Sequence, residues 1–280
     1  MHTTFCYMTI PDFFDGGAPS AILPYKVPPR LGLIDDSPDR WRNLRARISQ
    51  LNTTAEKDTA FKLLFFTRHG QAIHDLGKFK YGNEAWDTYW SLIDGDGELI
   101  WGCDPGLTDA GRAHAAMIHD AWTAEIQAGL PVPESLYCSP LRRAMETHEI
   151  IFGSLVPPDQ RTTLIDRCRR LRGGHTCDRR RSRTEILSAF PSSAVEADFT
   201  EDDELWERVG VETSEDVSEQ ARIVLDRIFR DPATYISVTA HGRIIAGCMQ
   251  CLSVPSGVLP TGGIYSVLIK AVAVTSEPVR

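Results

Sequence analysis

Two histidines, each placed directly after an apolar run, are the residues of this 280-residue chain best suited to chemistry. Arg68-His69-Gly70 follows the run at residues 62–67, and His241-Gly242 follows the run at residues 235–240. An imidazole beside a guanidinium can attack an anionic group, and a glycine lets the backbone come close to a ligand. The pattern predicts two imidazoles facing each other across a pocket for phosphate or a related anion.

A second guanidinium follows the short apolar run at residues 135–138. Ser139-Pro140 begins a predicted helix from about residue 141 to residue 152, because proline is tolerated in the first turn of a helix. Arg143 then lies near the helix N-terminus, where phosphate is already favoured. We therefore add Ser139 and Arg143 to the candidate anion-binding residues.

The elements that must position these residues alternate between strands and helices. Predicted strands cover residues 62–67, 135–138, 235–240 and 264–274, and predicted helices cover residues 41–51, 141–152 and 243–252. Two more amphipathic helices have apolar faces made of Ala113, Met117, Ala121 and Ala124, and of Val217, Ala221, Val224, Leu225 and Ile228. This alternation predicts an α/β fold with a mostly parallel central sheet flanked by helices, whose strand carboxyl ends form the ligand crevice.

Outside this alternation, we expect residues 1–60 to form an N-terminal arm packed on a domain of residues 61–280. Residues 1–40 are rich in proline, glycine and aspartate, which predicts little regular structure. An arginine-rich stretch and the acidic patch at residues 201–204 predict an insertion, about residues 165–212, over the pocket. Its arginines form either a solvated basic loop or a lip that attracts an anionic substrate: Arg167, Arg169, Arg170, Arg172, Arg179, Arg180, Arg181 and Arg183.

Composition excludes several classes of function. A formal charge of -8 argues against nucleic-acid binding, and no apolar run is long enough to span a membrane. The N-terminus lacks the pattern of a secretory signal, and seven scattered cysteines indicate reduced thiols, so we expect a cytoplasmic protein. Cys248 and Cys251 form a CxxC pair without a second pair, which favours helix packing over a metal site.

With these motifs together, the chain resembles the histidine phosphatase superfamily, and within it the fungal phosphoglycerate mutase-like proteins. The motifs occur in order from about residue 62 to residue 245: RHGQAIHD, DGDGELIWGCDPGLTDAGR, YCSPLRRAMET, GGHTCDRRRSRTEI, FTEDDELW and TAHGR. The resemblance implies the phosphoglycerate mutase-like fold and neither metal nor cofactor. It also implies that His69 becomes a phosphohistidine, that Arg68 and Arg143 clamp the phosphoryl oxygens, and that His241 donates to them.

Two positions depart from the family pattern. The asparagine expected six residues after the first histidine is Asp75, which cannot donate to phosphate when ionised. The glutamate expected to protonate the leaving oxygen aligns with Arg170, which cannot be a general acid. We expect Asp75 and Arg170 to form an ion pair; Asp166, Glu185 or His175 is the proton donor if the alignment is displaced.

The predicted function is that of a phosphohydrolase acting on a small anionic metabolite, phosphorylated or diphosphorylated. A diphosphate needs the missing acid least, and aromatic residues either line an apolar half of the pocket or belong to the core: Tyr81, Trp86, Tyr89 and Trp90. The alternative is a fold recruited for a dehydration, cyclisation or isomerisation in secondary metabolism. A non-catalytic anion-binding protein is a third hypothesis, and a mutase is disfavoured because the acid is missing.

Overall fold

The computed structural model describes residues 3–15, 26–210, 212–254, 257 and 259–275. Within this part of the chain, seven strands form one sheet in the order β1-β7-β2-β6-β3-β4-β5. The five strands from β2 to β5 in this order run parallel, and β7 is antiparallel to both β1 and β2. The strands are β1 (Thr3–Thr9), β2 (Thr59–Arg68), β3 (Ser135–Cys138), β4 (Thr162–Leu164), β5 (Ser193–Val195), β6 (Tyr235–Ala240) and β7 (Ile264–Thr275). The predicted mostly parallel α/β sheet is confirmed.

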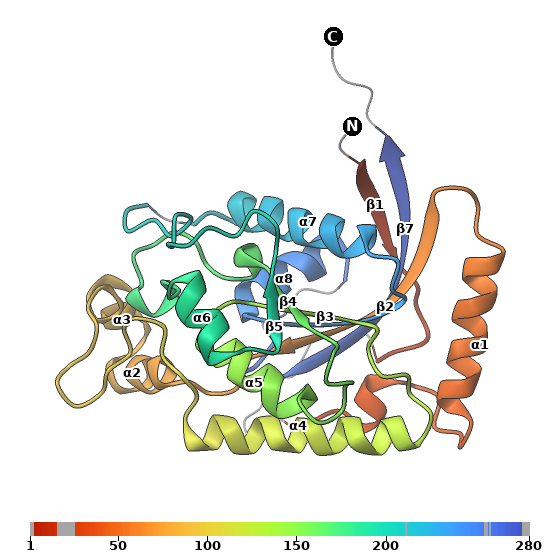
Figure 1. The fold of residues 1–280 in the computed structure, drawn as a ribbon, viewed down its shortest axis with the longest axis horizontal. Coiled ribbons are helices and arrows are strands. Elements are labelled where there is room, and N and C mark those ends of the chain that lie inside the picture. Colours follow the sequence, from red (N-terminus) through yellow and green to blue (C-terminus); the bar gives the residue numbers. More distant parts are fainter. Residues whose placement is uncertain (1–2, 16–25, 211, 255–256, 258, 276–280) are drawn as a thin grey trace, which may run out of the picture.

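Helices cover both faces of this sheet (Figure 1). The α-helices are α1 (Arg40–Thr53), α2 (Ile73–Tyr81), α3 (Asn83–Thr88), α4 (Asp109–Gln127), α5 (Arg142–Phe152), α6 (Arg183–Ala189), α7 (Ser214–Arg230) and α8 (Gly242–Cys251). Short 3-10 segments are η1 (Pro29–Gly32), η2 (Trp90–Leu92), η3 (Asp166–Cys168) and η4 (Thr176–Asp178). Helices α7 and α8 pack on one face, and α1 and α4 pack on the other.

Strand β2 shows why its sequence is continuously apolar. Leu64 and Phe66 point into the core beneath α7 and α8, whereas Leu63 and Phe65 point into the core beside α1 and α4. Successive side chains of a strand alternate between faces, so a strand buried on both faces needs apolar residues at every position. The apolar run in the sequence therefore predicted this central strand correctly.

The two long helices differ in how well the sequence predicted them. The stripe of α7 is buried as predicted, and Thr213 and Asp216 form a capping box at its start. Helix α4 is capped by Thr108, whose side chain accepts from the Gly111 backbone N–H, but its predicted apolar face is wrong. Its buried residues are Gly111, Ala115, Ile118 and Trp122, and the side chain of Met117 is exposed. The larger Ile118 and Trp122 decide the orientation because they bury more apolar area than alanines do.

Three strands were absent from the sequence prediction. The expected arm contributes β1, which pairs along its whole length with β7, so the first 40 residues contain more regular structure than predicted. Strands β4 and β5 have three residues each, too few to show a period in the sequence. Strand β5 lies within the predicted insertion and forms the edge of the sheet. The division of the chain at residue 60 stays a prediction.

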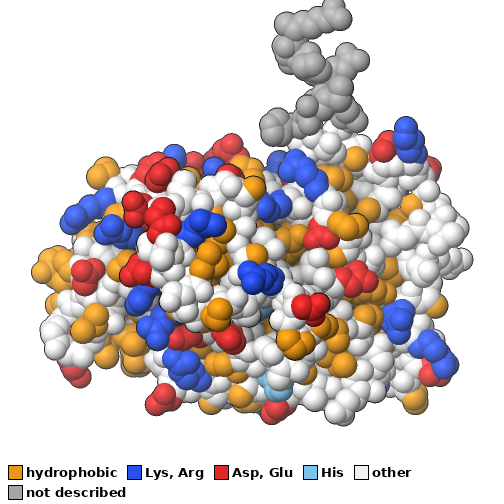
Figure 2. All heavy atoms as spheres, viewed as in Figure 1, with side chains coloured by type: hydrophobic (Ala, Val, Ile, Leu, Met, Phe, Trp, Pro, Cys, Tyr) orange, Lys and Arg blue, Asp and Glu red, His pale blue; other side chains and the backbone are white. Residues whose placement is uncertain are grey.

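Charged side chains of both signs are interspersed over the face seen in Figure 2. Among the described residues, none of the helices combines the length and the apolar character needed to cross a bilayer. Cys248 is buried in α8 and Cys251 makes a weak hydrogen bond to the Ser218 carbonyl, in agreement with helix packing of the CxxC pair.

Candidate active site

The parallel register of the central strands brings the two histidines together. Arg68 at the end of β2 is paired with Ala240 at the end of β6, so His69 and His241 follow at the same edge of the sheet. Their ring centroids are 4.8 Å apart. The expected facing pair of imidazoles is present, and both rings are buried.

His69 has one free ring nitrogen. Its Nδ1 lies 2.8 Å from the carbonyl oxygen of Gly70, and because a carbonyl only accepts, Nδ1 carries the proton and Nε2 keeps its lone pair. Burial, and then the positive charges of Arg143 and Arg68, lower the pKa of His69 well below 6.5, against an opposing effect of Asp75. The ring is neutral at neutral pH, as a nucleophile must be.

Two arginines flank the histidines from different elements. The Arg68 guanidinium donates to the Leu259 carbonyl at 2.8 Å, and Arg143 on α5 donates to the Cys177 carbonyl and to the Asp178 carboxylate, both at 2.7 Å. The Nε atoms of both arginines are buried and have no hydrogen-bond partner among the residues that the structure describes. Both side chains line the cavity, and a buried donor left unpaired is costly, which favours an anion beside them.

Ser139 orients His241. The Arg143 guanidinium donates to His241 Nδ1 at 3.3 Å, so His241 Nε2 carries the proton and donates to the Ser139 hydroxyl at 2.8 Å. Burial, then Arg143 and His69, lower the pKa of His241 well below 6.5. Ser139 therefore supports a site residue and is not among the residues that line the cavity.

Gly70 is needed for packing. A Cβ atom at this position would lie 2.6 Å from the backbone oxygen of Gly111, and the Gly70 N–H donates to the Thr147 hydroxyl. Gly70 is also absent from the cavity lining. The close approach at Gly70 is to the first turn of α4, and a contact of its backbone with a ligand stays a prediction.

The expected ion pair between Asp75 and Arg170 is not formed, although both residues line the cavity. The Asp75 carboxylate accepts from the Ala72 backbone N–H at 2.8 Å, which caps α2, and lies 3.4 Å from His74. Arg170 donates to the His175 ring at 3.0 Å and lies 3.9 Å from Glu212. Asp75 is thus bonded to the Ala72 backbone, and Arg170 lies near Glu212 instead of Asp75.

Only one of the three alternative proton donors reaches the cavity. Asp166 is buried in ion pairs with Arg169 and Arg180, and Glu185 caps the first turn of α6 through Ser182. His175 lines the cavity, beyond the turn made by Gly173 and Gly174, which have φ values of 113° and 68°. Its ring accepts a hydrogen bond from Arg170, and its pKa is lowered, chiefly by burial, so it is a poor acid in the free protein.

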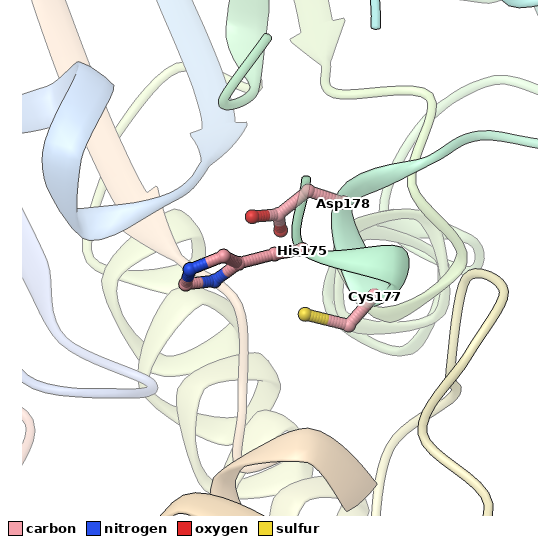
Figure 3. Close-up of side chains that lie close together, drawn as sticks. All are labelled: His175, Cys177 and Asp178. Carbon is pink, nitrogen blue, oxygen red and sulfur yellow. The ribbon is translucent and has the colours of Figure 1, made fainter. Parts of the chain in front are cut away.

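The side chains of His175, Cys177 and Asp178 project from the same side of one short segment, as Figure 3 shows. Potential ligand atoms of His175, Cys177 and Asp178 lie within 4.8 Å of one another. Three features oppose a cation there: Arg143 is bonded to Asp178, Arg170 is bonded to His175, and burial raises the pKa of the Cys177 thiol. This set is better suited to holding arginines at an anion site.

The arginine-rich segment forms no continuous lip. Arg169 and Arg180 are fully buried and paired with Asp166 and, for Arg169, with Asp203. Arg172 is paired with Glu207 and Asp216, so acidic residues neutralise much of the segment. Of the eight arginines, Arg170 lines the cavity around His69.

The aromatic residues form mainly a separate core. Tyr81 stacks on Trp90 with ring centroids 3.9 Å apart, and both pack with Trp101. Tyr89 is exposed, and Trp86, which is buried, is the aromatic residue that lines the cavity. The predicted apolar half of the pocket is therefore limited to one indole.

The cavity has a volume of about 380 Å³, in the range of small-molecule sites, and its lining is cationic on balance. Three carboxylates line it, those of Asp75, Asp87 and Asp178. Five cations line it as well: Arg68, Lys78, Arg143, Arg170 and Arg243. Several lining residues were not singled out from the sequence. His74, Asp178 and Arg243 lie in the quoted motifs, whereas Lys78 and Asp87 lie outside them. The GGHTCD and TAHGR segments were the signals that could have identified Asp178 and Arg243.

Comparison with known proteins gives a consistent result. The model of the histidine phosphatase superfamily (branch 1) matches residues 64–257. A "Probable phosphoglycerate mutase" of Arthroderma benhamiae is 36% identical over 85% of this chain and 72% of its own length. The "Probable phosphoglycerate mutase PMU1" of Saccharomyces cerevisiae is 28% identical, over 85% of this chain and 86% of its own. The solved ecdysone phosphate phosphatase of Bombix mori has a TM-score of 0.48 and 12% identity, over 73% of this chain and 88% of its own.

Proposed function

Since this chain belongs to the histidine phosphatase superfamily, we propose that it is a phosphohydrolase that acts on a small phosphorylated metabolite through a phosphohistidine at His69. The observation that carries the proposal is the unprotonated Nε2 of a neutral, buried His69, next to His241 and the unpartnered Nε–H groups of Arg68 and Arg143. We call these four residues the phosphoryl site.

The first step is attack of His69 Nε2 on phosphorus. The N–P bond forms as the bond from phosphorus to the leaving oxygen breaks, and Arg68 and Arg143 stabilise the charge on the phosphoryl oxygens. In the second step, water attacks phosphorus, releases phosphate and restores His69. Donors fixed in a buried cavity are effective because they need no reorganisation during the reaction.

His241 changes role when the anion binds. In the free protein its Nδ1 accepts from Arg143, so it offers no proton to the pocket. A phosphoryl group that draws Arg143 toward itself adds negative charge beside His241 and raises its pKa, which favours an imidazolium that donates from Nδ1.

Hydrolysis is favoured over mutase chemistry, whatever the names of the relatives. A mutase must return the phosphoryl group to a second oxygen and control a proton on it, which needs an acid beside the leaving oxygen. Arg170, which aligns with the expected acid, lines the cavity around His69 and cannot give up its proton.

A second candidate is a fold recruited for a dehydration, cyclisation or isomerisation, because Asp75 and Arg170 replace the usual amide and acid. Asp75 would then exchange protons and the arginines would bind a carboxylate or an enolate. The phosphoryl site argues against this candidate, since such chemistry does not require two imidazoles and two arginines around one anion.

Phosphate release from phosphomonoesters with good leaving groups, such as p-nitrophenyl phosphate, tests the proposal. We expect His69→Ala to lower kcat/KM by about 10⁴-fold or more, because the nucleophile is lost. Arg183→Gln, an exposed change in α6 outside the cavity, is the control and should retain the activity. Equal release by wild type and His69→Ala would contradict the proposal and direct attention to substrates without phosphorus.

A further inference from the structure

The cavity contains three cations that the phosphoryl transfer at His69 does not use. Lys78 from α2, Arg170 from the segment after η3 and Arg243 from α8 all line it. We call these residues the outer cations. They come from three separate parts of the chain, so the fold has gathered positive charge here although the chain as a whole carries -8.

Glu212 holds two of the outer cations in place. Its carboxylate lies 2.9 Å from the Arg243 guanidinium and 3.9 Å from that of Arg170, and its own side chain is only 3% exposed. One carboxylate shared by two arginines leaves one positive charge uncompensated. The Nε atom of Arg170 faces Glu212 at 3.9 Å, and among the described residues it has no hydrogen-bond partner, so the charge of Arg170 is only partly compensated.

Lys78 is less constrained. Its side chain makes no hydrogen bond or ion pair with any residue that the structure describes, and its charge acts on the rings of His74 and His175. His175 in turn contacts Arg170. Lys78 and Arg170 thus approach the same part of the cavity, next to His175. The Asp87 carboxylate also lies 3.9 Å from the His175 ring, and neither cation forms a close ion pair with it.

Asp178 interacts with the phosphoryl site and with one outer cation, Arg170. It bonds to Arg143 on one side, and although burial opposes its ionisation, Arg143 and then Arg170 lower its pKa. An ionised Asp178 lowers the mutual repulsion of Arg143 in the phosphoryl site and Arg170 among the outer cations, so both can line one cavity. A substrate with two adjacent anionic groups matches this arrangement.

Building on the proposed phosphohydrolase activity, we propose that the substrate is a diphosphate monoester and that Arg170, Lys78 and Arg243 bind its inner phosphate, which is the leaving group. His69 Nε2 attacks the terminal phosphorus, and the bond from that phosphorus to the bridging oxygen breaks. The bridging oxygen leaves with its electron pair as part of the monophosphate ester, and water then releases inorganic phosphate from His69. The balance is one diphosphate ester and one water giving one monophosphate ester and one inorganic phosphate.

The nature of the leaving group explains why Arg170 is compatible with catalysis. An alcohol leaving as an alkoxide needs a proton, and Arg170 cannot supply one. A phosphate leaves as a weakly basic anion that needs stabilisation by positive charge instead, which a guanidinium provides through two parallel N–H donors. Arg170 is then a catalytic residue of a different kind from the acid it replaces.

The test compares two substrates that share one alkyl group, 3-methylbutyl diphosphate and 3-methylbutyl monophosphate. We expect wild type to cleave the diphosphate with a kcat/KM about 100-fold or more above that for the monophosphate, the scale of a general-acid contribution. In Arg170→Gln, kcat/KM for the diphosphate should fall about 100-fold, as when one donor to a transition-state anion is removed. For p-nitrophenyl phosphate, which has a single phosphate, kcat/KM of Arg170→Gln should fall by no more than about tenfold.

Two further variants keep the result interpretable. Lys78→Gln removes a side chain without a partner among the described residues, so it should fold normally and show the same selective loss if Arg170→Gln proves unstable. Arg183→Gln is the control for the loss of one positive charge from the same segment. Equal cleavage of the two alkyl substrates, or an equal loss on both substrate types in the variants, would overturn the proposal while the dependence on His69 still stood.

Discussion

At the scale of single residues, hydrogen bonds determine which ring nitrogens can serve a substrate. The Gly70 carbonyl fixes the proton of His69 on Nδ1. Arg143 donates to Nδ1 of His241, which fixes the proton of that ring on Nε2, and this N–H donates to the Ser139 hydroxyl. The two rings are therefore prepared differently: His69 presents a lone pair, and His241 is held through a hydroxyl at its far side. The sequence identified both histidines but could not show which nitrogen of each is engaged, because that depends on contacts between separate elements.

Replacing Ser139 tests this orientation. Ser139→Ala removes the acceptor of the His241 N–H and leaves a buried donor unpaired, so we expect the free energy of unfolding to fall by about 1–3 kcal/mol. We also expect kcat to fall about tenfold or more with a smaller change in KM, because a misplaced ring affects the transition state more than substrate binding. Urea unfolding and steady-state kinetics measure the two effects.

Ser237→Ala is the matched control on the same strand, β6. The Ser237 hydroxyl is buried and makes no hydrogen bond with the described part of the chain, so its loss should change neither kcat nor the unfolding free energy by much. If both serine variants behaved alike, Ser139 would have no specific role in positioning His241.

At the scale of elements, one buried histidine links α5 to two strands. His148 on α5 contacts the Thr239 hydroxyl of β6 through Nδ1 and the Thr162 hydroxyl of β4 through Nε2. Burial lowers its pKa to about 3. Since α5 carries Arg143 and β6 leads to His241, this neutral ring connects the elements that supply two members of the phosphoryl site.

The pKa of His148 makes stability depend on pH. Its folded-state pKa is below the unfolded value of 6.5, so the unfolded chain takes up the proton first as pH falls, and stability present above pH 6.5 is lost toward pH 3. Between pH 7 and pH 5 this one group removes about 2 kcal/mol. His148→Gln cannot titrate, so its unfolding free energy should fall less than that of wild type by about this amount. Identical pH dependence in urea unfolding of both proteins would contradict the assignment.

Elements were predictable from sequence where apolar residues formed a long period. Strand β2 and helix α7 gave such patterns, whereas β4 and β5 are too short to show one. The face of α4 was misassigned because alanines suit either side of a helix, and the burial of Trp122 decides between them. Pairing of β1 with β7 joins residues at the two ends of the chain, which no local pattern indicates.

At the scale of the whole molecule, ion pairs with acidic residues determine which arginines keep an uncompensated charge. Acidic residues of the segment around residues 201–207 neutralise neighbouring arginines such as Arg169 and Arg172, and of the arginines in the arginine-rich segment Arg170 lines the cavity around His69. The sequence showed the excess of arginine but not which arginines were already paired. Arg170 lines the cavity, but its expected ion pair with Asp75 was wrong, because its neighbours His175 and Glu212 could not be identified from the sequence.

The most direct test of the central claim is to trap the phosphoryl group on the protein. Rapid mixing with p-nitrophenyl phosphate, quenching under alkaline denaturing conditions that preserve phosphohistidine, and peptide mass spectrometry would locate it. We predict one phosphoryl group on the peptide that contains His69, formed fast enough to account for turnover and absent from His69→Ala. Turnover without a phosphorylated peptide, or a phosphoryl group on His241 instead, would contradict the account.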